Sequence, residues 1–273
     1  MKKLGLISGS GELPFAVAAE ARSKGYHVTA IGLEGIADAS LESAVDEICW
    51  VNVGRLGALI NAFKKAGISD AVFAGKVHKS IIYKGKVIPD LRLLKMAFSL
   101  KNRSDDAIML GLTRELEKEG ITLLNTTDFT TRIMAPEGVL TRKKPSEEDY
   151  QDIAFGWKIA KAIGGLDIGQ TVVIKNRAVV AVEAIEGTDE AIKRGGSLAG
   201  KGAVVIKISK PQQDMRFDVP VVGPETLRSM AAVKASVLAI EAGKSILINQ
   251  AEFISEANRQ NIAVVGYRGD EDR

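Results

Sequence analysis

Residues 211–224 read PQQDMRFDVPVVGP and place two carboxylates around a guanidinium, with one residue between neighbours. Prolines at both ends disfavour a helix, and in an extended strand alternate side chains point to opposite faces. The segment therefore predicts a strand with one polar face, formed by Gln212, Asp214, Arg216 and Asp218. Carboxylates that hold Mg²⁺ beside a cation that neutralises phosphate oxygens are the pairing that phosphoryl transfer requires. The alternative is a surface network of ion pairs without chemistry.

A second acidic group surrounds a predicted turn in residues 181–192, AVEAIEGTDEAI, where a strand ends and a helix begins. Thr188 is placed to cap that helix, and acids in a first turn suit the helix dipole. The competing interpretation is that some of these carboxylates bind a hard cation, because such ions prefer oxygen ligands. The acids around the turn are Glu186, Asp189 and Glu190, and Glu183 precedes them in the strand.

Residues 9–14, GSGELP, follow a predicted strand and open a predicted helix. Backbone N–H groups and the helix dipole favour an anion at such a position. We therefore expect a phosphate or nucleotide site at Gly9, Ser10, Gly11 and Glu12. The pattern lacks the third glycine of the dinucleotide fingerprint, although Glu34 follows the second strand near the place of a ribose-binding acid. A tight turn without a ligand is the alternative.

Histidine is scarce, since His27 and His78 are the two in the chain. A His-rich dinuclear phosphoesterase site is therefore hard to build and zinc is disfavoured, which leaves metal binding to carboxylates. His27 lies inside a predicted strand and is expected to be structural. Lys76 and His78, in AGKVHKS, come at and just past a strand end and are candidates for ligand contact.

The elements that position these residues alternate between strand and helix in the first half of the chain. The runs KLGLIS, YHVTAIGL, EICWVNV and AVFAG predict strands, and LPFAVAAEARSKG and RLGALINAFKKAG predict helices between them. This βαβ order predicts a Rossmann-like parallel sheet with helices on both faces.

The second half is richer in strands. TVVIKNRAVVAVEAI predicts a hairpin that turns at Asn176 and Arg177, and AVVIKIS predicts a further strand. Residues 225–243 predict one helix, which two short strands follow.

A linker is predicted where the sequence loses its apolar residues. TRKKPSEEDYQD contains Pro145 and has no apolar anchor before Tyr150. We therefore expect an α/β protein with an N-terminal domain, a linker and a C-terminal α/β domain of similar size, over residues 1–140, 141–152 and 153–273.

Composition narrows the class of protein. Of the 273 residues, 46% are hydrophobic and 26% charged, which is typical of a globular protein, and a net charge of +3 is too small to indicate nucleic acid. The single cysteine, Cys49, excludes an internal disulfide framework and favours a reducing compartment. The short apolar run at the N-terminus predicts a first strand in place of a signal peptide. Because no run approaches the roughly 18 apolar residues of a membrane span, we expect only peripheral membrane contact.

One stretch suggests such contact. Residues 76–103 carry eight Lys and Arg residues and one acid, and DLRLLKMAFSLKN within it interleaves apolar and basic side chains. A docked helix with a solvated basic face explains this pattern. The alternative is a lid that meets acyl chains or anionic lipid.

Several motifs together carry a resemblance to a known family. They are LGLISGSGELP, VFAGKV, DDAIMLG, DIGQTVVIKNRAVVAVEAIEGTDEAI and QDMRFDVPVVGPETL, spread almost end to end along the chain. The sequence resembles the Mg²⁺-dependent UDP-2,3-diacylglucosamine pyrophosphatases of bacterial lipid A synthesis, the type unrelated to metallophosphoesterases. The resemblance implies an N-terminal Rossmann-like domain, a C-terminal α/β domain, and hydrolysis to UMP and 2,3-diacylglucosamine 1-phosphate. It also implies a place in the cytoplasm beside the inner membrane.

The resemblance also implies roles for particular residues. The family's essential metal-site aspartate matches Asp218, or alternatively Asp214, with Glu186 or Asp189 as a further Mg²⁺ ligand. Arg216 or Lys210 is expected to balance the charge of the pyrophosphate while water attacks the phosphorus on the sugar side. The substrate-binding candidates are Gly9, Ser10, Gly11, Glu12, Lys76, His78, Gln170, Thr188 and Lys210.

Two other functions compete with this one. A nicotinamide-dependent oxidoreductase would use the Gly9 loop, and tight NADH binding would favour it. A nucleotide-sugar sensor would bind a UDP sugar without turnover under any metal. A homodimer is expected from the frequency of such assemblies.

Overall fold

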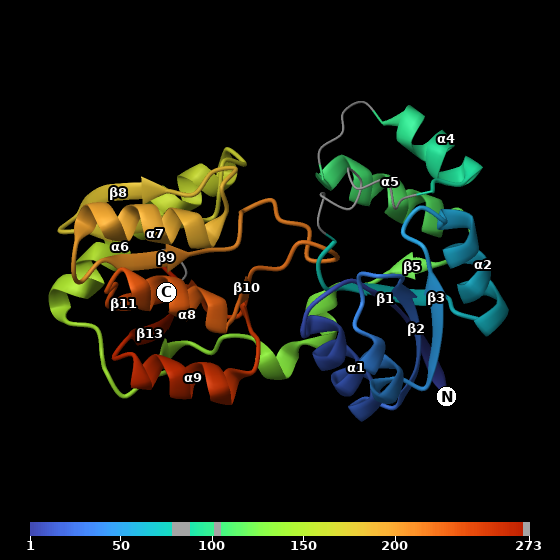
Figure 1. The fold of residues 1–273 in the computed structure, drawn as a ribbon, viewed down its shortest axis with the longest axis horizontal. Coiled ribbons are helices and arrows are strands. Elements are labelled where there is room, and N and C mark those ends of the chain that lie inside the picture. The colour runs from blue at the N-terminus through green and yellow to red at the C-terminus, as the bar shows by residue number, and fades with distance from the viewer. Residues whose placement is uncertain (78–87, 101–104, 270–273) are drawn as a thin grey trace. The chain divides into compact units, whose positions relative to one another are not determined.

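The computed structural model describes residues 1–77, 88–100 and 105–269 and divides them into two units (Figure 1). The first unit is Met1–Thr131 together with Met215–Phe217, and the second is Arg132–Asp214 with Asp218–Arg273. The predicted linker over 141–152 does not separate them. Helix α6 (Glu147–Gly165) begins inside it, where Ser146 and Asp149 form a capping box, so this segment belongs to the second unit.

The first unit is a parallel sheet covered by helices on both faces, which confirms the predicted class. The strand order is β3-β2-β1-β4-β5, with bounds β1 Lys2–Ser8, β2 Tyr26–Leu33, β3 Glu47–Val51, β4 Asp70–Ala74 and β5 Thr122–Leu123. Helix α1 (Leu13–Ser23) and the 3₁₀ segments η1 (Ala39–Ala44) and η2 (Thr126–Phe129) contribute to one apolar cluster. Helices α2 (Leu56–Ala66), α4 (Leu91–Ser99) and α5 (Asp105–Glu117) contribute to another.

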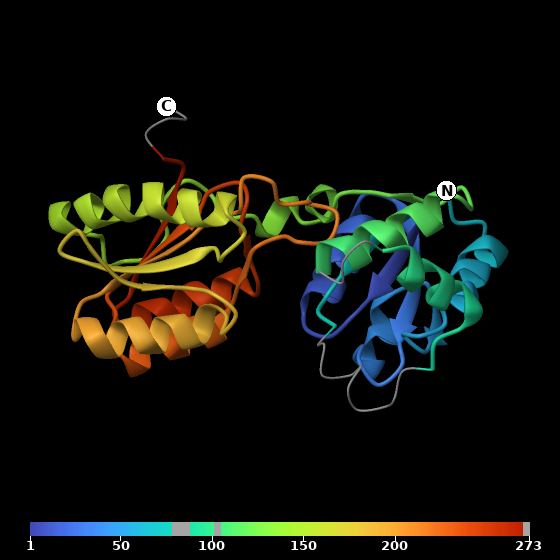
Figure 2. The same ribbon diagram turned by 90° about the horizontal axis from the view of Figure 1, so that it is seen from above.

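The second unit is a mixed sheet between helices. The strand order is β6-β13-β11-β9-β7-β8, with bounds β6 Gly138–Val139, β7 Thr171–Lys175, β8 Ala178–Val182, β9 Val204–Lys207, β11 Val237–Glu241 and β13 Ala263–Tyr267. Strands β9, β11 and β13 are parallel, and β7 runs antiparallel to β9. Figure 2 shows α6 on one face, with α7 (Thr188–Ala199), α8 (Pro224–Ala232) and α9 (Gln250–Arg259) on the other. A 3₁₀ segment η3 (Thr131–Ile133) and the two-stranded sheet of β10 (Val221–Val222) and β12 (Ile246–Leu247) complete the elements.

The helix predicted over 225–243 is wrong. Helix α8 ends at Ala232, and the next element is strand β11. Lys234 has a positive φ of 56°, which a helix cannot continue through. Val237 and its successors are fully buried between β9 and β13, and a parallel strand buried on both faces carries a continuous apolar run that resembles a helix in sequence.

The strand predicted over the DMRFD stretch is also wrong. Residues 208–220 form turns and irregular chain between β9 and β10. The N–H of Asp218 donates to the carbonyl of Asp214 at 2.9 Å, which closes a turn in place of an extended run. Alternating faces therefore do not exist here, and Met215–Phe217 groups with the first unit while its neighbours group with the second.

None of the helices within the described ranges is long and apolar enough to cross a membrane.

The predicted hairpin is present, and a buried carboxylate fixes its turn. Asn176 and Arg177 both have positive φ, at 51° and 56°, as a type I′ turn requires. Asp152 of α6 accepts hydrogen bonds from the N–H groups of both, at 3.0 and 2.6 Å. These two hydrogen bonds therefore join helix α6 to the β7–β8 turn.

Substitution of Asp152 by Ala should lower the free energy of unfolding by about 1–3 kcal/mol, because two N–H groups of the turn lose their acceptor. Urea unfolding monitored by circular dichroism measures the change. Asp152→Asn keeps one carbonyl acceptor and is the control, expected to lose less. An unchanged midpoint for Asp152→Ala would show that the turn holds without this clamp.

Candidate functional site

The first candidate position is the carboxyl edge of the first sheet, next to β1, where the strand order reverses. The order turns at β1, whose neighbours β2 and β4 lead in opposite directions, and open α/β sheets bind ligands outside such a point. The loops that follow β1 and β4 lie side by side. Ser10 and Lys76 exchange backbone hydrogen bonds of 2.9 Å, and the N–H of Gly9 donates to the carbonyl of Ala74 at 2.8 Å. A Cβ at Gly9 would lie 2.6 Å from the Lys76 carbonyl oxygen, so this approach requires glycine.

These contacts change what the GSGELP loop can offer. The N–H groups of Gly9 and Ser10 already have backbone acceptors, so they are not aimed at a phosphate. Glu12 is the N-cap of α1 and makes no capping hydrogen bond through its side chain, and Gly11 has a φ of 96°. The N-terminus of α1 is therefore the part of this loop that can face an anion. Lys76 has an exposed side chain beside it, and His78 lies outside the described residues.

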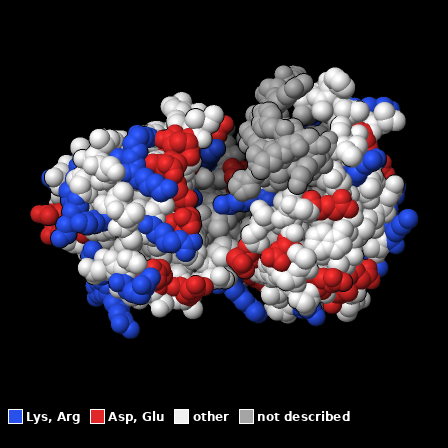
Figure 3. All heavy atoms as spheres, viewed as in Figure 1, with Lys and Arg blue, Asp and Glu red and all other residues white. Residues whose placement is uncertain are grey.

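The carboxyl edge of the second sheet gathers polar side chains that the sequence spreads over forty residues. Thr171 begins β7 directly opposite Lys207, which ends β9, because the two strands are antiparallel. Figure 3 shows Lys and Arg interleaved with Asp and Glu on the described surface of the face in view. We call the polar group at this carboxyl edge the edge cluster. Its members are Gln170, Thr171, Glu183, Thr188 and Lys207.

One hydroxyl joins two buried charges in the edge cluster. Glu183 is 7% exposed and Lys207 is 6% exposed. The Lys207 ammonium donates to the Thr188 hydroxyl at 3.2 Å, and that hydroxyl donates to the Glu183 carboxylate at 3.0 Å. A buried charge is tolerated when it is paired and hydrogen-bonded. Thr188 therefore couples the two charges in addition to beginning α7.

Two side-chain oxygens, one in the edge cluster and one next to it in the chain, are buried without a hydrogen bond. They are Oε1 of Gln170 and Oδ1 of Asp189, neither of which has a partner among the described residues. The N–H of Gln170 reaches Glu183 at 3.4 Å, which brings the predicted Gln170 and Thr188 to one place. Buried acceptors of this kind are rare, and both are oxygen atoms of the type that a hard cation or a ligand hydroxyl uses.

The predicted ligand Glu186 is engaged elsewhere. Its carboxylate forms an ion pair with Arg194 of α7, and the hydrogen bond from that guanidinium holds the pKa of the Glu186 carboxyl below its ordinary value. Its role as a metal ligand stays a prediction that this geometry does not favour.

The DMRFD stretch places its two acids at the ends of one turn. Asp214 and Asp218 are joined by the 2.9 Å backbone hydrogen bond, and both belong to the second unit. Arg216 belongs to the first unit, where its guanidinium lies 3.8 Å from Glu117 and its carbonyl accepts the Thr126 hydroxyl at 3.0 Å. Lys210 pairs with Asp167 at 2.6 Å. The turn thus holds the two predicted metal ligands at fixed backbone spacing.

The described residues contain no group of three or more His, Cys, Asp or Glu side chains arranged to hold a metal ion. Mg²⁺ in phosphoryl-transfer sites is usually held by one or two carboxylates and by the phosphates of the substrate. Asp214 and Asp218 fit that smaller requirement, because they supply hard oxygen ligands from one turn.

Sequence reasoning missed the charged side chains at the strand ends. Lys207 and Glu241 each close an otherwise apolar run, in VVIK and VLAIE, and both are buried. For Glu183 the sequence pattern predicts a place in a strand and no buried partner. A single charge at the carboxyl end of a buried strand was the signal that could have found all three.

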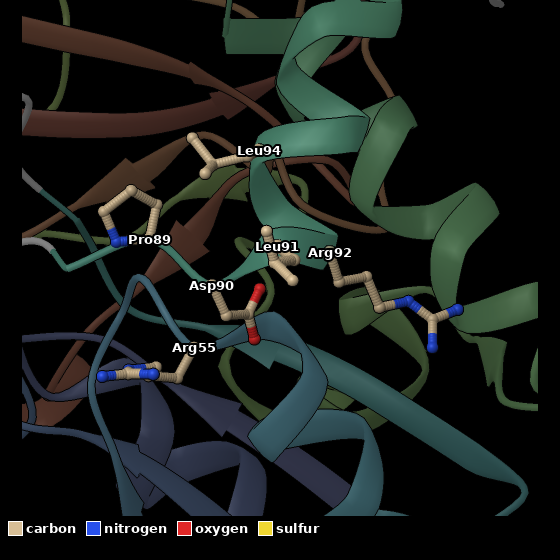
Figure 4. A pocket seen from close by; sticks show the side chains of 6 residues that line it. All are labelled: Arg55, Pro89, Asp90, Leu91, Arg92 and Leu94. Carbon is tan, nitrogen blue, oxygen red and sulfur yellow. The ribbon is translucent and has the colours of Figure 1, made fainter.

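A pocket of about 480 Å³ lies on the first unit beside α4 (Figure 4). Its acid is structural, because the Asp90 carboxylate accepts from the N–H groups of Leu93 and Gly57 at 2.8 and 2.7 Å. Arg92 points away from the pocket and pairs with Glu115 and Glu119, both at 2.8 Å. These contacts identify α4 as a capped, docked helix.

The fold defines an α/β protein of two units, and in open α/β sheets ligands bind outside the carboxyl ends of the strands. Comparison with models of known protein families identifies the family. Residues 3–133 match the model described as LpxI N-terminal domain, and residues 136–265 match LpxI C-terminal domain. The chain belongs to the LpxI family, which confirms the resemblance of its motifs.

A curated relative agrees with the family models. The chain is 32% identical over 277 residues to the UDP-2,3-diacylglucosamine pyrophosphatase LpxI of Caulobacter vibrioides, covering 97% of this chain and 98% of the relative.

Solved structures add little. Phosphoribosylglycinamide synthetase from Anaerococcus prevotii is 15% identical with a TM-score of 0.27, over 70% of this chain and 34% of that one. The biotin carboxylase domain of the Hydrogenobacter thermophilus 2-oxoglutarate carboxylase is 14% identical with a TM-score of 0.28, over 65% of this chain and 35% of that one. The chain spans about a third of each, and likeness at this level carries no argument.

Replacement of Thr188 by Val should remove the hydroxyl between Lys207 and Glu183 while keeping the side-chain shape. We expect a loss of about 1–3 kcal/mol of stability, since two buried charges lose a hydrogen-bond partner. Thermal unfolding measures it. Thr188→Ser retains the hydroxyl and is the matched control, so equal losses in the two variants would contradict the bridging role.

Proposed function

We propose that this chain hydrolyses the pyrophosphate of UDP-2,3-diacylglucosamine to UMP and 2,3-diacylglucosamine 1-phosphate, a step of lipid A biosynthesis. The observation that carries the proposal is the match of both halves of the chain to the LpxI family models, together with the end-to-end relative of that activity. The edge cluster and the DMRFD turn supply the polar groups that such a reaction needs.

The roles proposed for the DMRFD turn follow from its chemistry. Asp218 and Asp214 would hold Mg²⁺ through their carboxylate oxygens. When bound, Mg²⁺ neutralises charge on the phosphate oxygens and makes the attacking water more acidic. The water oxygen forms a bond to the sugar-side phosphorus, and the bond from that phosphorus to the bridging oxygen breaks, so UMP leaves with the bridging oxygen. Arg216 or Lys210 offsets the charge that develops on the phosphate.

The other candidate residues take binding roles in this proposal. UMP lies at the N-terminus of α1, near Gly11 and Glu12, where the helix dipole favours its phosphate. Gln170 and Thr188 contact the substrate from the edge cluster, since one supplies an unpaired buried oxygen and the other a hydroxyl. The acyl chains meet apolar side chains that α4 leaves exposed.

Helix α4 also supports the proposal of peripheral contact with an anionic inner-membrane surface, on the cytoplasmic side. Met96 packs into the core, while Leu91 and Phe98 on the opposite side are 76% and 84% exposed. Lys95 and Arg55 are exposed near them. An apolar stripe flanked by cations binds anionic lipid by partial burial and charge attraction. A homodimer stays a prediction, which light scattering measures.

The reaction is tested by incubating the purified protein with UDP-2,3-diacylglucosamine and Mg²⁺ in ¹⁸O-water, with and without EDTA. Mass spectrometry then identifies the products and the position of the label. We expect UMP and diacylglucosamine 1-phosphate, with ¹⁸O in the sugar phosphate, and no cleavage with EDTA. If the ¹⁸O label appeared in UMP, water would attack the phosphorus on the nucleotide side instead. No cleavage with any divalent metal would contradict the function.

Replacement of Asp218 by Ala should lower kcat by about 100-fold or more, which corresponds to about 2.7 kcal/mol of transition-state stabilisation. The substrate should still bind, since its nucleotide and acyl groups have other contacts, and equilibrium binding of the lipid substrate to the variant checks this. Asp214→Ala is the comparison, and the larger loss identifies the essential ligand. Wild-type turnover in Asp218→Ala would show that the assignment is wrong.

Replacement of both Leu91 and Phe98 by Ser should reduce sedimentation with vesicles of phosphatidylglycerol and phosphatidylethanolamine about tenfold or more. An apolar side chain that moves fully from water into an apolar environment contributes about 1.5–3 kcal/mol, and the double variant loses two of them. Ile185→Ser, at an exposed apolar residue of the second unit, is the control. Equal binding by the double variant and the wild type would remove the membrane role of α4.

A further inference from the structure

A buried carboxylate lies where the loop that carries Asp214 and Asp218 leaves the second sheet. Glu241 is the last residue of β11 and is 2% exposed. The Lys161 ammonium of α6 donates to both of its oxygens at 2.7 Å, and Lys244 lies 3.0 Å away. The N–H of Ser209 also donates to it, at 2.8 Å. Neutralising the charge would need one lysine, so the Ser209 contact calls for a separate explanation.

Ser209 is the first link in a closed turn. Lys161 also donates to the Ser209 carbonyl at 3.2 Å, so both backbone groups of this residue are held by the Glu241–Lys161 pair. The Ser209 hydroxyl and the Lys210 N–H donate to the side-chain oxygen of Gln213 at 2.9 and 2.8 Å. The Gln213 N–H returns to the Lys210 carbonyl at 3.0 Å. These hydrogen bonds hold residues 209–213 as one turn against the end of the sheet.

The fixed turn ends one residue before the proposed metal ligands. Asp214 follows Gln213 directly, and its carbonyl accepts the Asp218 N–H. Hydrogen bonds and peptide bonds thus run without a break from β11 to both aspartates, all within the second unit. Replacing a buried ion pair by apolar residues is often neutral or stabilising, so stability alone is a poor reason for the pair.

We propose that Glu241, together with Lys161, is a positioning residue for the pyrophosphatase reaction: it sets the exit direction of loop 208–220 and thereby the place of the Asp214 and Asp218 carboxylates. The inference rests on the proposed role of those two aspartates. Phosphoryl transfer depends on the placement of charge near the reacting phosphorus, so a small displacement of the turn reduces turnover more than it reduces substrate binding.

Four variants separate positioning from stability. Glu241→Gln keeps the shape but gives Lys161 an amide in place of a carboxylate oxygen. Lys161→Met removes the lysine that also holds the Ser209 carbonyl. Lys244→Met removes the other cation of the same carboxylate, which donates to no atom of Ser209, and is the matched control. Phe253→Leu, fully buried on α9, lowers stability away from the loop.

Two readouts are compared for each variant: the split between kcat and KM, and the rate of tryptic cleavage after Arg216. Trypsin does not cut before proline, so Lys210 is protected by Pro211 and cleavage in loop 208–220 falls at Arg216. Cleavage requires local opening, so its rate reports how firmly the loop is held.

For Glu241→Gln and Lys161→Met we expect kcat to fall about tenfold or more, KM to stay within about threefold, and cleavage after Arg216 to accelerate about tenfold. Lys244→Met and Phe253→Leu should change neither readout. Should Glu241→Gln fail to fold, Lys161→Met decides the question, because the Lys161 side chain is 28% exposed and Glu241 is buried.

Wild-type kcat and cleavage rate in the two test variants would overturn the proposal. Equal loss of kcat in Phe253→Leu at the same fall in melting temperature would overturn it as well. If the wild type does not cleave the substrate at all, the proposed function has failed, and the tryptic rates still decide whether Glu241 anchors the loop.

Discussion

The buried charges at the carboxyl edge of the second sheet constrain how the elements around that edge are arranged. Glu183, Lys207 and Glu241 all end or follow strands there and are almost removed from solvent. Each needs a partner from another element, because an isolated buried charge is far costlier than a paired one. Thr188 of α7 and Lys161 of α6 meet that need from opposite faces of the sheet. The edge therefore fixes the ends of both helices and the loop between β9 and β10 together.

The fold was predictable where local patterns agree with the long-range arrangement. Apolar periodicity predicts the βαβ order of the first half, and turn chemistry predicts the Asn176–Arg177 hairpin. The prediction failed in residues 225–243 because the buried run of β11 has no alternation to distinguish it from a helix. It failed again at residues 211–219, where prolines exclude a helix and also permit turns. Both segments are decided by neighbours that the local sequence does not contain.

The candidate site was predictable in its residue types more than in its contacts. Gln170 and Thr188 lie together, and Asp214 and Asp218 share a turn. The partners of the Gly9 loop come from the end of β4, where Lys76 is 66 positions after Ser10. They use N–H groups that the motif alone assigns to a phosphate. Lys161 and Glu241 are 80 residues apart. No spacing rule predicts pairs that only the strand order of the sheet creates.

The DMRFD stretch is unusual because its residues are divided between two units. Met215–Phe217 belongs to the first, where Thr126 donates to the carbonyls of Met215 and Arg216. Phe217 is partly buried and packs against the apolar cluster of that unit. Asp214 and Asp218 belong to the second and are the covalent neighbours of that segment. Within the second unit, the Glu241 anchor holds the turn of residues 209–213 that leads directly into Asp214. The order of this irregular loop therefore comes, on the second-unit side, from hydrogen bonds to Glu241, Lys161 and Gln213 in place of the ladder of a strand.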